Sequence, residues 1–312
     1  MSEVRAHRFA ERPRAPFQFT PHLERFSIPG MPVPHLYIPD RRAFRVAVRV
    51  GDAIAGASIV VEGEPWEPVL SGEIYAPSRS AAEEAVQAVL SMVRADFDYE
   101  RFLEAVRSLD ERLYKLAAKY LGLRPGRCTS LYAALADSIV KQRVSLRAGL
   151  RIYSRLVERY GCRVEAGGAT YYWHPCPEAL ASQDPEDLRR VGLTRVKARA
   201  LVEVARAELE GRLPSVAEAV RDPWGVAREL TRIYGVGEWT AQLAVAMVSP
   251  GFPLGPLSDL AVARGLRAAV GCVDCQRLAR RLVEEIPEYA GLILYLAAYE
   301  YEELGRRGKS AG

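Results

Sequence analysis

L-T-R-I-Y-G-V-G-E-W-T-A-Q-L, at residues 230–243, is the stretch that decides the fold. Apolar residues at helical spacing run into Gly235-Val236-Gly237, and the same spacing resumes directly afterwards. Two glycines around one small apolar residue allow a tight hairpin between helices and leave main-chain N–H groups uncovered at the start of the second helix. An anion such as a nucleic-acid phosphate is favoured there. The alternative is an ordinary helix connection with a glycine C-cap, and the motif alone does not decide between them.

A second feature is Asp259, which follows Trp239 in a Pro- and Gly-flanked loop, P-L-S-D, that leads into an apolar helix. One interpretation makes Asp259 only the N-cap of that helix. The other makes it a carboxylate that faces whatever the hairpin holds, where it would stabilise a developing positive charge.

A third feature is S-I-V-K-Q-R-V-S at residues 138–145, an apolar helix that is interrupted at Gln142-Arg143 and restarts with Ser145 as N-cap. Three arginines then recur at i,i+4 spacing on one helical face, which suits a row of phosphate contacts: Arg147, Arg151 and Arg155.

The composition is that of a globular protein, since 49% of the 312 residues are apolar and 26% are charged. No run of residues approaches the ~18 consecutive apolar positions that a membrane helix needs. The basic N-terminal segment lacks the apolar core of a signal peptide, so we expect a cytoplasmic protein. Five cysteines at scattered positions do not indicate the disulfide framework of a secreted protein.

Charge is distributed unevenly along the chain, although the net charge is only +4. Residues 51–110 carry a net charge of −8, and residues 111–160 carry +8. The basic block indicates either a phosphate-binding face or a solvated amphipathic helix, and charge alone favours the second. Asparagine is absent and arginine exceeds lysine, which suits a thermophile or reflects nucleotide composition.

Periodicity divides the chain near residue 98. Residues 43–50 alternate strictly and predict a half-buried antiparallel strand, with shorter β-rich segments at 58–61 and 68–75. Ser78 then opens a helix, while residues 1–30 show no clear period. Beyond Tyr99 the pattern is almost continuously helical, and it predicts helices near 100–120, 130–139, 145–160, 185–190, 195–210, 215–220, 224–233, 239–248, 258–269, 275–285 and 289–304.

Five segments together resemble one family: I-Y-G-V-G-E-W-T-A (233–241), P-L-S-D (256–259), I-V-K-Q-R-V-S (139–145), V-G-L-T-R-V-K-A-R-A-L (191–201) and L-R-P-G-R (123–127). They resemble the helix-hairpin-helix (HhH-GPD) DNA glycosylase superfamily, and most of all its 3-methyladenine-DNA glycosylase II branch. The likeness spans nearly the whole chain. It implies an α+β fold, with a small N-terminal antiparallel sheet domain at 1–98 and a mainly helical core. That core has two subdomains, one at 99–129 together with 256–312 and one at 130–255.

The resemblance also implies roles for residues. Asp259 corresponds to the catalytic carboxylate, and Trp239 and Tyr295 correspond to walls of a base pocket. A core role for Tyr295 is an equal alternative, and Leu243 replaces an aromatic of the bacterial type. Arg143 lies where the family places a wedge that fills the gap left by an extruded nucleotide. The implied DNA contacts are Gly235, Val236, Gly237, Thr240, Gln142, Arg143 and Ser145.

Trp239 stands where bifunctional members have a lysine that forms a Schiff base, so we expect a monofunctional enzyme that uses water.

Cys272 and Cys275 are too few for the iron–sulfur cluster of the endonuclease III branch, and they are either incidental or a weak redox pair. No cofactor and no metal ligand is expected, apart from room for a monovalent cation on hairpin carbonyls. The N-terminal sheet is expected to serve as a scaffold.

The expected function is hydrolysis of the N-glycosidic bond of a flipped-out alkylated purine, which leaves an abasic site in the repair of double-stranded DNA. We expect a monomer without membrane attachment. Two alternatives stay open: an oxidised-purine (8-oxoguanine) glycosylase and a non-catalytic helix-hairpin-helix DNA-binding protein.

Overall fold

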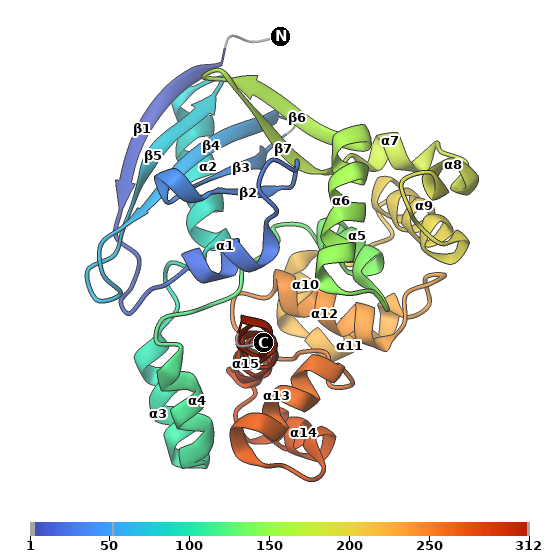
Figure 1. The fold of residues 1–312 in the computed structure, drawn as a ribbon. Coiled ribbons are helices and arrows are strands. Elements are labelled where there is room, and N and C mark those ends of the chain that lie inside the picture. Colours follow the sequence, from blue (N-terminus) through green and yellow to red (C-terminus); the bar gives the residue numbers. More distant parts are fainter. Residues whose placement is uncertain (1–3, 52, 311–312) are drawn as a thin grey trace.

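The computed structural model describes residues 4–51 and 53–310. Its N-terminal part is a five-stranded antiparallel sheet in the order β1-β5-β4-β3-β2, with α2 (Arg79–Met92) packed on one face (Figure 1). The strands are β1 (Arg5–Glu11), β2 (His35–Ile38), β3 (Ala43–Val50), β4 (Ala53–Glu62) and β5 (Val69–Ala76). Strand β3 has the predicted bounds, because its alternating apolar side chains enter the core between the sheet and α2. Ser78 caps α2 as predicted, by accepting from the Ala81 amide.

The N-terminal 30 residues contain two elements that the sequence does not predict. Strand β1 is an exposed edge strand, so it carries no apolar alternation. Helix α1 (Thr20–Phe26) is too short to show a helical period, and it lies beneath the sheet, facing the helical part of the molecule (Figure 1).

The rest of the chain is mainly helical, and the α+β class is confirmed. The first helices are α3 (Tyr99–Leu109), α4 (Glu111–Lys119), α5 (Leu131–Lys141), α6 (Leu146–Tyr160), α7 (Pro177–Ala181) and α8 (Pro185–Arg189). They are followed by α9 (Arg195–Leu209), α10 (Val216–Arg221), α11 (Pro223–Leu230), α12 (Glu238–Val248), α13 (Leu260–Val270), α14 (Cys275–Glu285) and α15 (Ala290–Ser310). No helix in the described part of the chain is long and apolar enough to cross a bilayer.

One helical prediction needs correction, and one hairpin is not predicted at all. The single helix expected at 100–120 is two helices, because Asp110 ends α3 and its carboxylate accepts from the amides of Arg112 and Leu113 to start α4. Residues 161–175 form an unpredicted hairpin of β6 (Gly161–Ala166) and β7 (Ala169–Pro175). Its turn is Gly167-Gly168, with both residues at positive φ, so the Gly-Gly dipeptide was the available signal.

Three hydrophobic clusters fill the interior. One lies under the sheet, one joins α3 and α4 to α13, α14 and α15, and one joins the helices α5 to α12. These three clusters follow the order of the predicted domain and subdomains along the chain. The exact boundaries of the domains stay a prediction.

Two buried arginines join the sheet to the helical region. The Arg94 guanidinium donates to the carbonyls of Ser249, Pro250 and Gly251, in the loop before α13. Burial lowers the pKa of Arg94 to about 9. Arg124 donates to the carbonyls of Arg94 and Pro16. Each guanidinium is buried without a carboxylate, and main-chain oxygens satisfy its donors instead.

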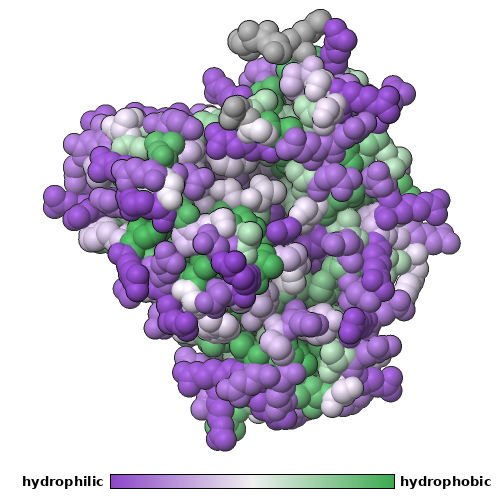
Figure 2. Space-filling model, turned by 180° about the vertical axis from the view of Figure 1, so that it is seen from behind, coloured by the Kyte–Doolittle hydropathy of each residue, from purple (hydrophilic) through white to green (hydrophobic). Residues whose placement is uncertain are grey.

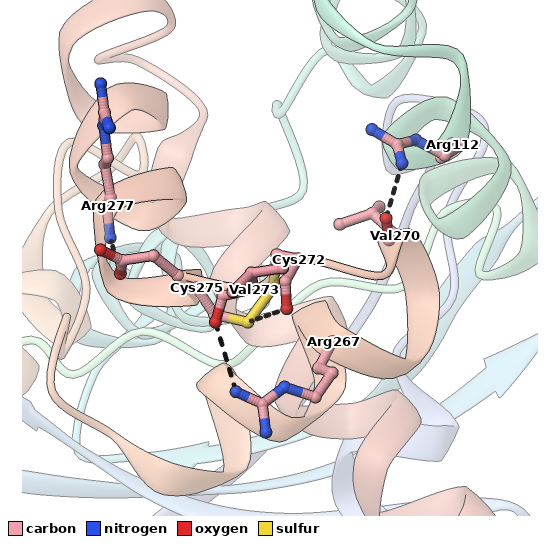
Figure 3. The surroundings of a disulfide bond; sticks show 8 residues. Arg112, Arg267, Val270, Cys272, Val273, Cys275 and Arg277 are labelled. Carbon is pink, nitrogen blue, oxygen red and sulfur yellow. Dashed lines mark hydrogen bonds between the residues drawn. A yellow bond between two sulfur atoms is a disulfide. The ribbon is translucent and has the colours of Figure 1, made fainter.

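Four cysteines are paired. Cys162 bonds to Cys176 across the β6–β7 hairpin, a pairing that the spacing does not predict. Cys272 bonds to Cys275 between α13 and α14, in a loop flanked by Arg112, Arg267 and Arg277 (Figure 3). This disulfide does not line the cavity described below.

Candidate active site

The hairpin predicted at 235–237 is present between α11 and α12. Gly235 has φ +77°, and a Cβ there would lie 2.6 Å from the Ala200 Cβ, so both its backbone conformation and its packing require glycine. Gly237 is the N-cap of α12, and a Cβ there would meet no atom within 4 Å. No side chain of the described residues caps the first N–H groups of α12, and Gly237 lines the cavity described below, as an anion site requires.

Gln142 ties the break between α5 and α6 to this hairpin. Its side-chain amide donates to the Gly235 carbonyl over 2.9 Å and to the Thr240 hydroxyl over 2.8 Å. Ser145 caps α6 by accepting from the Ala148 amide, as predicted. Arg143 is exposed and has φ +50°, an unusual conformation for a non-glycine residue. The strained turn therefore presents the Arg143 side chain at the surface, while Gln142 is held inward.

Asp259 satisfies both interpretations of its sequence position. Its Oδ1 accepts from the amides of Ala261 and Val262, over 2.8 and 3.1 Å, so it caps α13. Its Oδ2 accepts from the Trp239 indole Nε1–H over 2.9 Å. Three N–H donors from two helices thus fix the carboxylate, which is only partly buried and lines a cavity.

That cavity has a volume of about 1770 Å³ and lies between the N-terminal and helical parts of the chain. We name two of its surfaces. The hairpin wall consists of Gln142, Gly235, Trp239, Thr240 and Asp259. The histidine wall consists of His22, Arg25, His35, His174 and Tyr295. Arg143, Ser145, Gly237 and Leu243 also line the cavity, so the structure brings together nearly all of the predicted site residues.

The sequence does not predict the histidine wall, apart from Tyr295. The His22 Nδ1 lies 3.1 Å from the Tyr295 hydroxyl, and burial holds the pKa of His22 well below its ordinary value. Burial also lowers the pKa of His35 to about 4 and that of His174 to about 3. These imidazoles are therefore neutral near pH 7. His22 belongs to the unpredicted α1, and no local pattern links it to a residue 273 positions away.

Two lysines line the cavity although none stands at the position of Trp239. The Lys141 amine lies 2.7 Å from the Asp137 carboxylate. The Lys197 amine donates to the Val140 carbonyl over 2.9 Å, and burial lowers its pKa. Both amines are thus engaged by an acceptor.

The outer surface suits a polyanionic partner near the cavity. Arg147, Arg151 and Arg155 are all exposed on α6, as the predicted phosphate row requires. On the face opposite to that of Figure 1, hydrophilic residues predominate and the apolar ones form small separate patches (Figure 2).

Comparison with known proteins shows what this part of the chain is similar to. Residues 136–287 match the model of the HhH-GPD superfamily of base excision DNA repair proteins. DNA-3-methyladenine glycosylase 2 of Escherichia coli is 32% identical over 129 residues, which are 41% of this chain and 45% of that protein. DNA-3-methyladenine glycosylase of Bacillus subtilis is 27% identical over 186 residues, 59% of this chain and 61% of that protein. The matched segment thus spans about half to three fifths of these curated relatives.

A solved structure extends the likeness to the whole fold. The 3-methyladenine DNA glycosylase of Archaeoglobus fulgidus has a TM-score of 0.77 and 23% identity, and the match covers 94% of this chain and 98% of that one. The superfamily match includes the hairpin, the Gln142 turn and Asp259, the segments that build the hairpin wall. Residues 136–287 of this chain therefore match the HhH-GPD superfamily, and the chain resembles the 3-methyladenine-DNA glycosylases.

Proposed function

We propose that the protein is a monofunctional DNA glycosylase of base excision repair, which hydrolyses the N-glycosidic bond of flipped-out alkylated purines of the 3-methyladenine type. The observation that carries the proposal is the Asp259 carboxylate, fixed in the wall of a large cavity beside the Gly235–Gly237 hairpin. The names of the curated relatives support the reaction class. The proposed partner is double-stranded DNA that contains a damaged base, bound by a monomer.

The cavity and its surroundings offer a group for each step of such a reaction. A target base inside a duplex is out of reach, so it must be extruded, at a cost of a few kcal/mol. The N–H groups at the start of α12 would hold a backbone phosphate, and Arg143 would fill the gap in the duplex. The base would then enter the cavity against the Trp239 ring.

Asp259 would act on the sugar. As the bond from C1′ to the purine nitrogen breaks, its electron pair leaves with the base, and positive charge develops on the sugar. The carboxylate stabilises that charge, and its fixed orientation costs no reorganisation at this moment. Water then adds to C1′ and loses one proton to solvent, which leaves an abasic site. A purine alkylated on a ring nitrogen is cationic, so it departs as a neutral base.

Replacement of Asp259 by Asn tests the proposal. We expect the single-turnover release of 3-methyladenine from duplex DNA to fall at least about a hundredfold, while affinity for the duplex changes little. Asp274→Asn is a matched control, because Asp274 caps α14 in the same way, through the Arg277 amide, and does not line the cavity. A D259N protein that releases the base at the wild-type rate would show that Asp259 is not the catalytic carboxylate, and a wild-type protein that binds the duplex but releases no base would identify a DNA-binding module without catalysis.

An oxidised-purine glycosylase with lyase activity is the second candidate, because Lys141 and Lys197 line the cavity. In the proposed water mechanism, borohydride treatment during turnover on 8-oxoguanine DNA traps no covalent adduct. An adduct that maps to either lysine would overturn the monofunctional assignment.

A further inference from the structure

The loop from α13 to α14 contains a disulfide whose two cysteines have different surroundings. Cys272 lies two residues after the end of α13 and is partly exposed, whereas Cys275 is the first residue of α14 and is only 5% exposed. Val273, between them, is 94% exposed, so the loop projects from the surface. The disulfide lies outside the cavity, and an inference drawn from it is independent of the proposed function.

The two helices favour a negative charge on Cys275 over one on Cys272. Cys275 begins α14, a helix of 11 residues, and the positive end of the helix dipole stabilises a thiolate there. Cys272 follows the C-terminus of α13, which is the negative end of that helix. An external thiolate can reach Cys272, the more exposed partner, and the bond to Cys275 then breaks with the charge on the favoured sulfur.

Two arginines hold the main chain of this loop (Figure 3). The Arg267 guanidinium donates to the Val273 carbonyl over 3.4 Å, and the Arg112 guanidinium donates to the Val270 carbonyl over 2.7 Å. Arg112 is also paired with the carboxylate that caps its own helix, so Arg267 supplies most of the attraction for an incoming anion. The loop carboxylate, Asp274, is engaged as the N-cap of α14.

The other disulfide, Cys162–Cys176, has the opposite surroundings. The helix that follows it, α7, has only five residues, and a carboxylate oxygen of Glu178 lies within 4.8 Å of both sulfurs. This carboxylate repels an incoming thiolate and disfavours a departing one, although Arg49 pairs with it at 3.5 Å. The fifth cysteine, Cys128, is free and buried, and burial raises its pKa to about 12, so it does not compete as a nucleophile.

We propose that Cys272 and Cys275 form a thiol-exchange site for small-molecule thiols, separate from the cavity. A thiolate of the external reductant attacks Cys272 Sγ and forms a mixed disulfide. The bond between the two protein sulfurs breaks, and its electron pair stays on Cys275 Sγ.

A second reductant thiolate completes the exchange. It attacks the external sulfur of the mixed disulfide, so that Cys272 leaves as a thiolate and the reductant is released as its own disulfide. Two reductant thiols are thereby oxidised, and the two protons that they lose end on the protein sulfurs. The Cys272 carbonyl lies 3.2 Å from Cys275 Sγ and is an acceptor for the S–H formed there.

The rates at which the two disulfides are reduced test the inference. The full oxidised chain would be treated with reduced glutathione and quenched with acid, and the freed thiols would be alkylated in denaturant and located by mass spectrometry. We expect Cys272 and Cys275 to be freed at least about tenfold faster than Cys162 and Cys176. Equal rates, or faster reduction of Cys162–Cys176, would overturn the inference. So would a wild-type protein in which oxidised glutathione leaves Cys272 and Cys275 as two free thiols.

Variants with one cysteine of the pair test the direction of the exchange. Cys275→Ser leaves Cys272 free, Cys272→Ser leaves Cys275 free, and each protein would be incubated with oxidised glutathione. We expect the glutathione adduct to form on Cys272 at least about tenfold faster than on Cys275, because Cys272 is the accessible partner. Cys176→Ser is the matched control for the loss of one disulfide, and the adduct on its free Cys162 should form more slowly than that on Cys272. A faster adduct on Cys275 or on Cys162 would contradict the assigned site.

Discussion

The two walls of the cavity are built in different ways. Apart from Gln142, the hairpin wall joins residues that are near in sequence, such as Trp239 and Asp259, and main-chain amides at a helix end orient its carboxylate. The histidine wall joins the two ends of the chain, since His22 contacts Tyr295 and Arg25 pairs with Glu302. The groups of the hairpin wall are thus set mainly by local backbone geometry, whereas those of the histidine wall depend on how distant segments pack.

The two walls also differ in the charge of the side chains that they present to the cavity. The hairpin wall presents the carboxylate of Asp259, which suits a positive charge that develops on a sugar. The histidine wall presents the Arg25 cation and neutral imidazoles, which suit the acceptor edge of a base. A nucleotide can satisfy both surfaces because its sugar and its base are chemically different.

Gly235→Ala is expected to have the largest effect on this comparison. A side chain at positive φ and a Cβ 2.6 Å from Ala200 should together cost about 2–4 kcal/mol of unfolding free energy. Chemical denaturation measures the loss, and DNA affinity should fall with it. Gly237→Ala is the matched control, because its Cβ meets no atom within 4 Å. If G235A is as stable as G237A, the hairpin wall does not depend on its backbone geometry.

Acidification should weaken the histidine wall. The pKa of His174 is about 3 in the folded protein, far below its ordinary value of about 6.5, so the unfolded state binds more protons between these values. The stability that His174 contributes is therefore present above pH 6.5 and is lost as pH falls, by up to about 1.4 kcal/mol per pH unit.

The free energy of unfolding in urea would be measured at several pH values for the wild type and for His174→Phe. The difference between the two proteins isolates the contribution of His174 from that of the carboxylates. The variant should show a smaller loss of stability on acidification. Identical slopes for the two proteins would mean that His174 is not held neutral by burial.

Trp239→Phe is expected to have the smallest effect. The variant keeps an aromatic ring in the hairpin wall and loses only the indole N–H bond to Asp259. Base release should slow about tenfold, which corresponds to one weakened orienting contact. An unchanged rate of base release would show that the indole N–H does not orient the carboxylate.

The sequence predicts most of the hairpin wall and little of the histidine wall for the same reason. Glycine hairpins, N-caps and helical periods are local, so Gly235, Ser145 and Asp259 can be found from their neighbours alone. Helix α1 has a single turn of apolar spacing and an Arg- and Pro-rich context, so no periodicity reveals it. Tyr295 is predicted only through the family resemblance. Its contact with His22 needs the packing of α1 against α15, which no local pattern contains.

Arg94 limits which hybrid proteins can be made from this chain and a relative. Its guanidinium comes from the segment that follows α2 and holds the carbonyls of Ser249, Pro250 and Gly251, a few residues ahead of the Asp259 loop. A hybrid that exchanges residues 1–98 for the sheet of a relative must keep an arginine at this place. Otherwise three main-chain oxygens lose their donor beside the reactive loop. Residues 1–98 therefore cannot be exchanged independently of the helical part of the protein.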